Sequence, residues 1–417
     1  MTDTSTLSTS MPAGVSAQAA SSSKRICSLD IMRGFMITAM VFVNDMADLV
    51  PVQGVPQFLR HMPGGVDGFT FVDLIIPIFM FLLGASIPLA LGKRLGRGDS
   101  IPAVIGHIAL RAAALIVMGL MDVNRWGGMG REFGVMFDWP LGLWKFLAWS
   151  FIFVIWLDFP KQSRTAKNVH TGLRVAAIAG LVWLAVVFRT SKGATFTTSW
   201  WGTLGQLGWS YLIASLAWLA FKKNKIGILV VFALMHAAYL AMSAGWYTAP
   251  AWMKWVGRST ITTNSANTVA GLCVGMLLAD ASAWKDKIRW ALIFALAAAI
   301  GAVIAHPVGD IGYHMPSSSW SLSATAIALV AWAGLYWLTD IKGFRTGLDP
   351  LRTVGQNSLL LFQLSRYGIL CYWLTGLTFY DALARPTAVG MARSFGYAIL
   401  LAAITYIATK KRVFLKV

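Results

Sequence analysis

The chain has 417 residues, of which 57% are hydrophobic and only 12% are charged. An average soluble domain has about 25% charged residues, so this composition excludes an ordinary soluble protein and indicates a polytopic membrane protein. The net charge of +18 does not indicate nucleic-acid binding, because the Lys and Arg residues stand in short clusters between apolar runs and not on a basic arm or face. This spacing is typical of the positive-inside rule and of contacts with anionic membrane lipids.

The first residues of the chain differ from the rest. Residues 1–23 are rich in Ser, Thr and Ala and contain no Lys or Arg, so they lack the basic start and the apolar core of a signal peptide. We interpret them as a disordered cytoplasmic tail, followed by a single membrane domain over residues 24–417. The three cysteines, Cys27, Cys273 and Cys371, form no CxxC pair and predict neither a disulfide framework nor a zinc site.

Twelve apolar runs approach the length of about 20 residues that a membrane-spanning helix needs. In chain order they cover residues 30–49, 70–91, 102–121, 141–158, 172–188, 203–221, 225–243, 265–281, 288–306, 320–339, 354–375 and 388–408. The count falls to eleven if the run at 141–158 or 203–221 re-enters the membrane without crossing it. The predicted fold is therefore an all-α, polytopic membrane helix bundle with 11 to 12 transmembrane helices.

Basic residues are concentrated in alternate loops. The clusters lie at residues 93–97, 161–167, 222–225, 285–289, 342–352 and 410–416. By the positive-inside rule, these loops and both termini are cytoplasmic. The opposite face then presents His61 and the loops around residues 126–139, 200–201, 244–264 and 306–320. Short basic loops and the lack of a targeting segment suggest the inner (cytoplasmic) membrane of a bacterium.

The first apolar run carries three polar residues of interest. Asp30 and Arg33 are three residues apart and share a helix face near the cytoplasmic end. They either form a local ion pair or offer a guanidinium group to phosphates that enter from the cytoplasm. Asn44 lies about two thirds of the way along the same helix. Its amide either bridges two helices or donates to a reacting carbonyl oxygen.

His61 is the leading catalytic candidate. It begins a loop rich in Pro and Gly, HMPGGVDG, and Asp73 stands at the start of the apolar run that follows. A lone histidine in a loop is usually a solvated side chain, and an aspartate at a helix start usually caps the helix. Alternatively, Asp73 accepts a hydrogen bond from Nδ1 of His61, which makes Nε2 a base or a nucleophile.

The other histidines are weaker candidates. His306 and His314 flank an outer loop and suit the rim of a substrate entrance. Together with Asp310 they have the i, i+4, i+8 spacing of a helical metal site. Pro307 and Gly312 break the helix that this spacing would need, so we predict no metal.

The sequence leaves three classes of function open. No Walker loop, dinucleotide fingerprint or G-x-S-x-G elbow is present. A secondary transporter of a sugar or an organic acid, with proton coupling through His61 and Asp73, is the main alternative to an enzyme, because carriers also use helices interrupted by Gly and Pro. Against it, the two halves of the chain show no internal repeat. The third possibility is a membrane component that only binds the partners of a polysaccharide machine.

Two blocks of sequence resemble a known enzyme family. The stretch SLDIMRGFMITAMVFVN, then His61, then DGFTFVDLIIPIFMFLLGASI resembles the N-terminal signature of the heparan-α-glucosaminide N-acetyltransferase family, particularly its bacterial relatives. Residues 318–344, followed by VGQNSLLLF at 354–362, resemble the C-terminal signature of that family. The resemblance implies an enzyme that takes the acetyl group of cytoplasmic acetyl-CoA and delivers it to a sugar hydroxyl or amine on the periplasmic side.

The resemblance also implies roles for individual residues. The catalytic group would be His61, Asp73 and Asn44. Acetyl-CoA would contact Arg33, Asp30 and Asn357, with Lys93 and Arg94 as further basic groups near its phosphates. We expect the acceptor sugar at Asp67, Trp320 and Ser365. Val66 and Ser365 replace a tryptophan and a histidine of the animal enzymes, so the acceptor sugar, and whether it offers an amine or a hydroxyl, stays open. The sequence also leaves open an acetyl-histidine intermediate and a homodimer.

Overall fold

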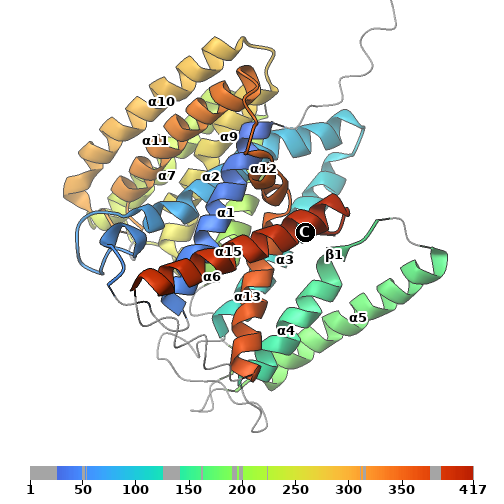
Figure 1. Ribbon diagram of the computed structural model, residues 1–417. Coiled ribbons are helices and arrows are strands. Elements are labelled where there is room, and N and C mark those ends of the chain that lie inside the picture. Colours follow the sequence, from blue (N-terminus) through green and yellow to red (C-terminus); the bar gives the residue numbers. More distant parts are fainter. Residues whose placement is uncertain are drawn as a thin grey trace, which may run out of the picture.

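The computed structural model of the chain is a bundle of helices (Figure 1). It describes residues 26–48, 52, 54–124, 141–160, 163–189, 195–196, 201–222, 224–309, 311–312, 316–375 and 387–416, apart from the side chains of residues 48, 141–142 and 368–375. The predicted tail at 1–23, the outer loop at 126–139 and the residues Asp310 and His314 lie outside this range.

The described residues are mostly helical, which confirms the predicted all-α class. The α-helices are α1 (Cys27–Asp48), α2 (Phe71–Gly96), α3 (Ile101–Val123), α4 (Leu141–Trp156), α5 (Arg164–Val187), α6 (Gly202–Phe221), α7 (Lys225–Ser243), α8 (Ala251–Val256), α9 (Ser265–Ala279), α10 (Trp284–Ala305), α11 (Ser318–Leu335), α12 (Asp349–Gly355), α13 (Ser358–Thr375) and α15 (Thr387–Lys410). Shorter elements are the 3₁₀ helices η1 (Gln57–Leu59) and η4 (His306–Val308), the π-helical segments η3 (Thr260–Asn264) and η5 (Tyr336–Ile341), and the paired strands β1 (Leu157–Asp158) and β2 (Phe414–Leu415).

Within the described range, 10 helices are long and apolar enough to cross a membrane, and a shorter apolar helix covers Leu143–Trp156. The chain is therefore a multi-pass membrane protein. The predicted run at 354–375 differs in one respect, because α12 ends at Gly355 and α13 begins only at Ser358. Between them, the backbone N–H of Asn357 donates to the carbonyl of Val354 at 2.9 Å. This hydrogen bond reaches back three residues, whereas an α-helical bond reaches back four, so the α-helical pattern is interrupted here.

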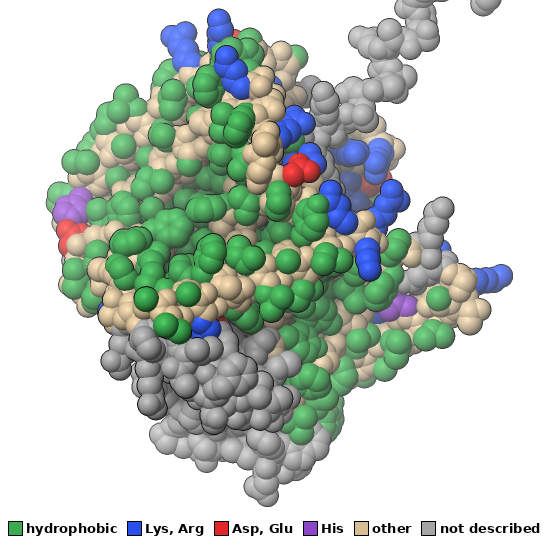
Figure 2. Space-filling model, in the orientation of Figure 1, with side chains coloured by type: hydrophobic (Ala, Val, Ile, Leu, Met, Phe, Trp, Pro, Cys, Tyr) green, Lys and Arg blue, Asp and Glu red, His purple; other side chains and the backbone are tan. Residues whose placement is uncertain are grey.

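At one end of the bundle, segments that the positive-inside rule assigns to the cytoplasm contact one another. The carboxylate of Asp340 accepts the backbone N–H groups of Cys27 and Ser28, each at 2.8 Å, so the end of η5 caps the start of α1. Lys225, the first residue of α7, pairs with Asp280, directly after α9. In Figure 2 most of the visible Lys and Arg side chains gather along the upper and right edges of the view, and hydrophobic side chains cover the surface beyond them.

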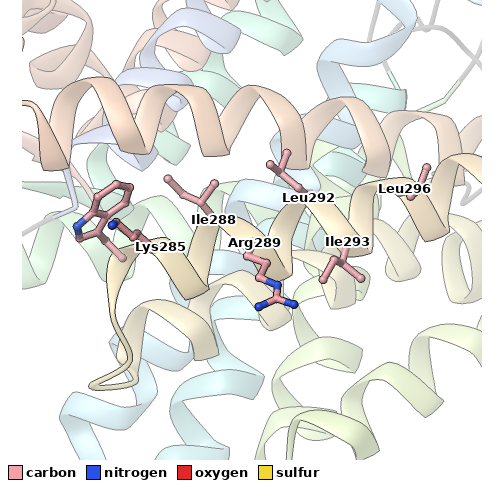
Figure 3. A pocket seen from close by; sticks show the side chains of 7 residues that line it. Lys285, Ile288, Arg289, Leu292, Ile293 and Leu296 are labelled. Carbon is pink, nitrogen blue, oxygen red and sulfur yellow. The ribbon is translucent and has the colours of Figure 1, made fainter.

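Helix α10 shows the same change from basic to apolar residues along its own length. Lys285 and Arg289 lie in its first two turns, and Ile288, Leu292 and Leu296 continue the exposed side as apolar surface (Figure 3). A cationic start followed by apolar residues suits a helix that enters the hydrocarbon core from the basic side of a membrane.

Helix α2 is fixed in the centre of the bundle by α9. An added Cβ atom at Gly84 would lie 1.8 Å from the carbonyl oxygen of Thr268, and one at Gly271 would lie 1.9 Å from that of Phe81. Gly271 and Gly275 form a G-x-x-x-G pattern, which lets two membrane helices approach backbone to backbone. This close packing holds the first turn of α2, where Asp73 lies, at the opposite end from the basic loops.

Candidate active site

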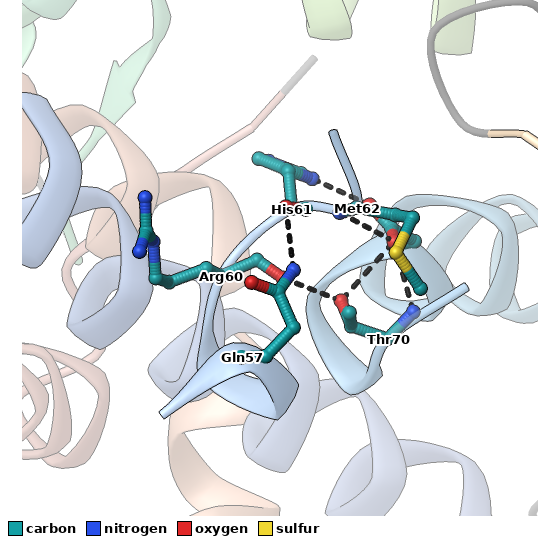
Figure 4. Close-up of polar contacts among 6 residues, drawn as sticks. Gln57, Arg60, His61, Met62 and Thr70 are labelled. Carbon is teal, nitrogen blue, oxygen red and sulfur yellow. Dashed lines mark hydrogen bonds and ion pairs between the residues drawn. The ribbon is translucent and has the colours of Figure 1, made fainter. Parts of the chain in front are cut away.

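The loop between α1 and α2 is organised around the carboxylate of Asp73. This side chain is fully buried in the first turn of α2, and its Oδ1 lies 2.6 Å from Nδ1 of His61. Its Oδ2 accepts the backbone N–H groups of Met62 at 3.1 Å and of Thr70 at 2.9 Å (Figure 4). Thr70 also donates its hydroxyl to the carbonyl of Arg60 at 2.7 Å. Asp73 therefore caps α2 and fixes the loop around His61 at the same time.

These contacts orient the imidazole ring of His61. An ionised carboxylate can only accept hydrogen bonds, so Nδ1 of His61 donates to Asp73 and Nε2 keeps its lone pair in the neutral ring. Gln57 donates from Nε2 to the backbone carbonyl of His61 at 3.2 Å, which helps to hold the main chain. The His61 side chain is 38% exposed. The pair has the arrangement by which a carboxylate prepares a histidine for base or nucleophilic chemistry.

Asn44 and His61 line the same cavity, although one lies on α1 and the other in the loop. This histidine cavity has a volume of about 500 Å³ and is lined by Val43, Asn44, Met46, Ala47, Val52, Gly54, Val55, Leu59, Arg60, His61 and Val72. The structure thus brings together the amide, the imidazole and, behind the imidazole, the carboxylate that the sequence singled out.

A second cavity lies further along the same two helices, toward the basic end. This arginine cavity has a volume of about 480 Å³ and includes the cations Arg33, Arg111 and Lys416 in its lining. No Asp or Glu occurs among the described residues that line it. Arg33 donates to Asp30 at 3.0 Å and to the hydroxyl of Ser86 at 2.7 Å. Arg33 is therefore ion-paired, as one of the two interpretations predicts, and it also lines a cavity, while its contact with phosphates stays a prediction.

The two cavities follow one another along α1 and α2. On α1 the arginine cavity reaches Met40 and the histidine cavity begins at Val43, while on α2 the corresponding residues are Ile76 and Val72. At about 1.5 Å per residue, these gaps of three and four residues correspond to roughly one helical turn. The pair of cavities therefore follows the α1 and α2 helices from the basic end of the bundle to His61.

Two predicted donor-site residues, Arg94 and Asn357, have other contacts. Arg94 pairs with Asp99 at 3.1 Å, and neither Lys93 nor Arg94 is among the described residues that line the arginine cavity. Asn357 does line that cavity, but its amide is bonded to the C-terminal segment: Nδ2 donates to the carbonyl of Val413 at 2.9 Å.

Two predicted acceptor-site residues are buried away from both cavities. Trp320 in α11 is 1% exposed, and Ser365 in α13 is 7% exposed. The hydroxyl of Ser365 donates to the carbonyl of Phe362 at 2.7 Å. Neither residue is among the described linings of the histidine or arginine cavity.

Asp67 joins the candidate catalytic loop to the loop that follows α10. Its Oδ2 lies 2.8 Å from Nε2 of His306, and its Oδ1 accepts the backbone N–H of Ile311 at 2.8 Å. The N–H of Gly68 donates to the carbonyl of Ile311, also at 2.8 Å. The hydrogen bonds from His306 and Ile311 lower the pKa of Asp67 below its ordinary value of 3.8. We call these contacts the outer clasp.

Sequence reasoning missed two of the three cations in the arginine cavity. Arg111 lies inside the apolar run at 102–121, and its guanidinium stands 4.9 Å from the ring centre of Tyr211. An arginine within a membrane span is rare and usually marks a function, so this signal was available. Lys416 had no such signal, because its position in the cavity depends on how the chain folds back after α15.

Fold and site together define a multi-pass membrane protein with two successive cavities, one of which is lined by a histidine that is paired with a buried aspartate. The catalytic model of the heparan-alpha-glucosaminide N-acetyltransferase family matches residues 25–138. The human protein heparan-alpha-glucosaminide N-acetyltransferase is 35% identical over 100 residues, which is 24% of this chain and 14% of that protein. The mouse protein of the same name is 34% identical over 104 residues, 25% of this chain and 15% of that protein.

Over this segment the chain is similar to the heparan-alpha-glucosaminide N-acetyltransferase family. The aligned part spans only about one seventh of the length of the curated relatives that it matches. The segment matched by the family model contains Arg33, Asn44, His61 and Asp73 as well as Arg111, but ends before the C-terminal block that carries Asn357.

Proposed function

We propose that the protein is a membrane acetyltransferase that moves the acetyl group of acetyl-CoA from the basic end of the bundle to a sugar hydroxyl or amine at the opposite end. The proposal rests chiefly on two cavities in series, one lined with cations and the next with Asn44 and His61. The names of the relatives support acetyl transfer as the chemistry.

Acetyl-CoA enters from the cytoplasmic side. Its phosphates lie at the arginine cavity, where Arg33 and Arg111 supply guanidinium groups suited to phosphate oxygens. Lys93 and Arg94, at the end of α2, add positive potential outside the cavity. The pantetheine arm follows the α1 and α2 helices, and the thioester reaches the histidine cavity. No metal ion takes part in this scheme.

His61 supplies the chemistry, with Asp73 holding its ring. Nε2 takes the proton of the sugar hydroxyl or amine as that oxygen or nitrogen attacks the thioester carbonyl, and the thiolate of CoA leaves. Alternatively, Nε2 attacks the carbonyl first and passes the acetyl group on. Asn44 donates from its amide to the developing oxyanion, a contact worth about 3 kcal/mol in comparable sites.

The acceptor approaches from the opposite face, which we assign to the periplasm of a bacterium. Asp67 and the outer clasp stand at that face, beside the loop of His61. A sugar is the natural partner for such an exposed carboxylate, which can accept hydrogen bonds from hydroxyl groups.

A secondary transporter is the alternative, with His61 and Asp73 as a proton relay. Purified protein in proteoliposomes separates the two functions. With acetyl-labelled acetyl-CoA outside and a panel of saccharides inside, a transferase puts label on an enclosed saccharide. Release of unlabelled saccharide that depends on a proton gradient, with no label transferred, would instead establish a carrier.

A further inference from the structure

The chain reverses direction directly after α15. The N–H of Val413 donates to the carbonyl of Ala408 at 2.9 Å, and that of Arg412 donates to Thr409 at 3.0 Å. These are the two bonds of a Schellman motif, in which the residue at the turn adopts a left-handed conformation. Arg412 does so, with φ 60°. Residues 413–416, which we call the C-terminal strap, therefore run back across the basic end of the bundle.

Side-chain and backbone bonds hold the strap on two sides. The amide of Asn357 donates to the carbonyl of Val413 at 2.9 Å and to the hydroxyl of Thr409 at 3.1 Å, and its Oδ1 accepts the N–H of Leu415 at 3.1 Å. On the other side β2 pairs antiparallel with β1, and the N–H of Lys416 donates to the carbonyl of Trp156 at 3.0 Å. Both donors of the Asn357 amide are thus used within the protein.

The strap forms part of the wall of the arginine cavity. Phe414 and Lys416 both line it, and Nζ of Lys416 lies 2.7 Å from Oδ2 of Asp158. An ammonium group has three donors, so the bond to Asp158 leaves donors for a ligand in the cavity. The Lys416 side chain is 61% exposed, which places this cation at the solvent side of the cavity. Arg33 is already bonded to Asp30 and Ser86.

We propose that the C-terminal strap is part of the acetyl-CoA site, with Lys416 binding a phosphate group of the nucleotide and Asn357 acting as the positioning residue that holds the strap. This inference rests on the proposed function. It assigns Asn357 an indirect role, through the strap, and it assigns nucleotide recognition to a segment far from the catalytic loop in sequence.

The test compares two donors that differ in their phosphates. Affinity is measured for acetyl-CoA and for S-acetylpantetheine, which has the same thioester and no nucleotide. Wild-type protein should prefer acetyl-CoA, and Lys416→Ala should lower acetyl-CoA affinity about five- to tenfold, as expected for the loss of a charge-assisted bond to phosphate. Affinity for S-acetylpantetheine should not change. Lys416→Arg should restore the preference, and Asn357→Ala should lose it as Lys416→Ala does.

Lys411→Ala is the matched control, because Lys411 is an exposed lysine of the same region that does not line the cavity. If wild-type protein prefers acetyl-CoA and Lys416→Ala keeps the whole preference, the strap assignment is wrong while the proposed function stands. If wild-type protein binds neither donor, both are overturned. Lys416 is exposed, so its replacement tests the inference even if Asn357→Ala fails to fold.

Discussion

At the scale of single residues, the proposed chemistry depends on the hydrogen bond between His61 and Asp73. The carboxylate is buried and selects the ring form of His61 that keeps a lone pair on Nε2. Asp73→Asn should therefore leave the protein folded but with the ring of His61 wrongly oriented or protonated. In a comparable triad this change lowers kcat by about 10⁴. Steady-state transfer assays should show a loss of this order, and a loss below tenfold would argue that Asp73 serves only as a helix cap.

Replacing Asn44 tests whether the developing oxyanion is stabilised. If its amide donates to the oxyanion, Asn44→Ala removes a contact that forms fully only in the transition state. The value of kcat should then fall by about 10² to 10³, while the KM for acetyl-CoA changes little. Should KM rise with kcat unaltered, Asn44 would be a binding residue or a packing residue, and the oxyanion assignment would fail.

The outer clasp predicts a particular dependence of stability on pH. The pKa of Asp67 is lower in the folded protein than its ordinary value of 3.8, because His306 and Ile311 donate hydrogen bonds to it. Its contribution is therefore fully present above the unfolded pKa and is lost as the pH falls through the lowered, folded pKa.

The Tm difference between wild-type protein and Asp67→Asn should thus be nearly constant from pH 7 down to about pH 4 and should vanish below that. A difference that already disappears between pH 7 and pH 5 would show that the clasp depends on another titrating group.

At the scale of elements, the contact between α2 and α9 positions the catalytic loop. Gly271→Ala would place a Cβ 1.9 Å from the carbonyl oxygen of Phe81, so the helices would have to separate. Such overpacking costs about 1 to 3 kcal/mol, and the thermal stability of detergent-solubilised protein should fall. Gly396→Ala on α15 is the matched control, since an added Cβ there meets nothing within 4 Å. Equal stability of the two variants would contradict the proposed role of this contact.

The helices were largely predictable from the sequence, and the reason is physical. In lipid every backbone polar group must be bonded within the segment, so long apolar runs have to be helices. The pairing of His61 with Asp73 was also predictable, as one of two alternatives, because only a short loop separates the two residues. The turn at Asn357 and the role of Lys416 were not predictable, since they depend on contacts of Asn357 and β1 with the end of the chain. The burial of Trp320 and Ser365 was not predictable either, because a sequence motif does not reveal which residues pack inside the bundle.

At the scale of the whole molecule, the two ends of the bundle differ in charge and in the groups they carry. Most of the visible Lys and Arg side chains gather toward one end (Figure 2), where the arginine cavity also lies, and His61 with the outer clasp lies at the other end. Acetyl-CoA is strongly anionic and cannot cross a hydrocarbon core, whereas an acetyl group carries no charge. A path along α1 and α2 would let the acetyl group reach the far side while the nucleotide stays where it entered.

The most direct test is acetyl transfer from labelled acetyl-CoA to a panel of mono- and oligosaccharides by purified wild-type protein, His61→Ala and the control His170→Ala on α5. We predict that wild type and His170→Ala label a saccharide, and that His61→Ala labels none while keeping the wild-type Tm. Undiminished transfer by a folded His61→Ala variant would contradict the assignment of His61, and the absence of transfer by wild-type protein to any saccharide would contradict the proposed function.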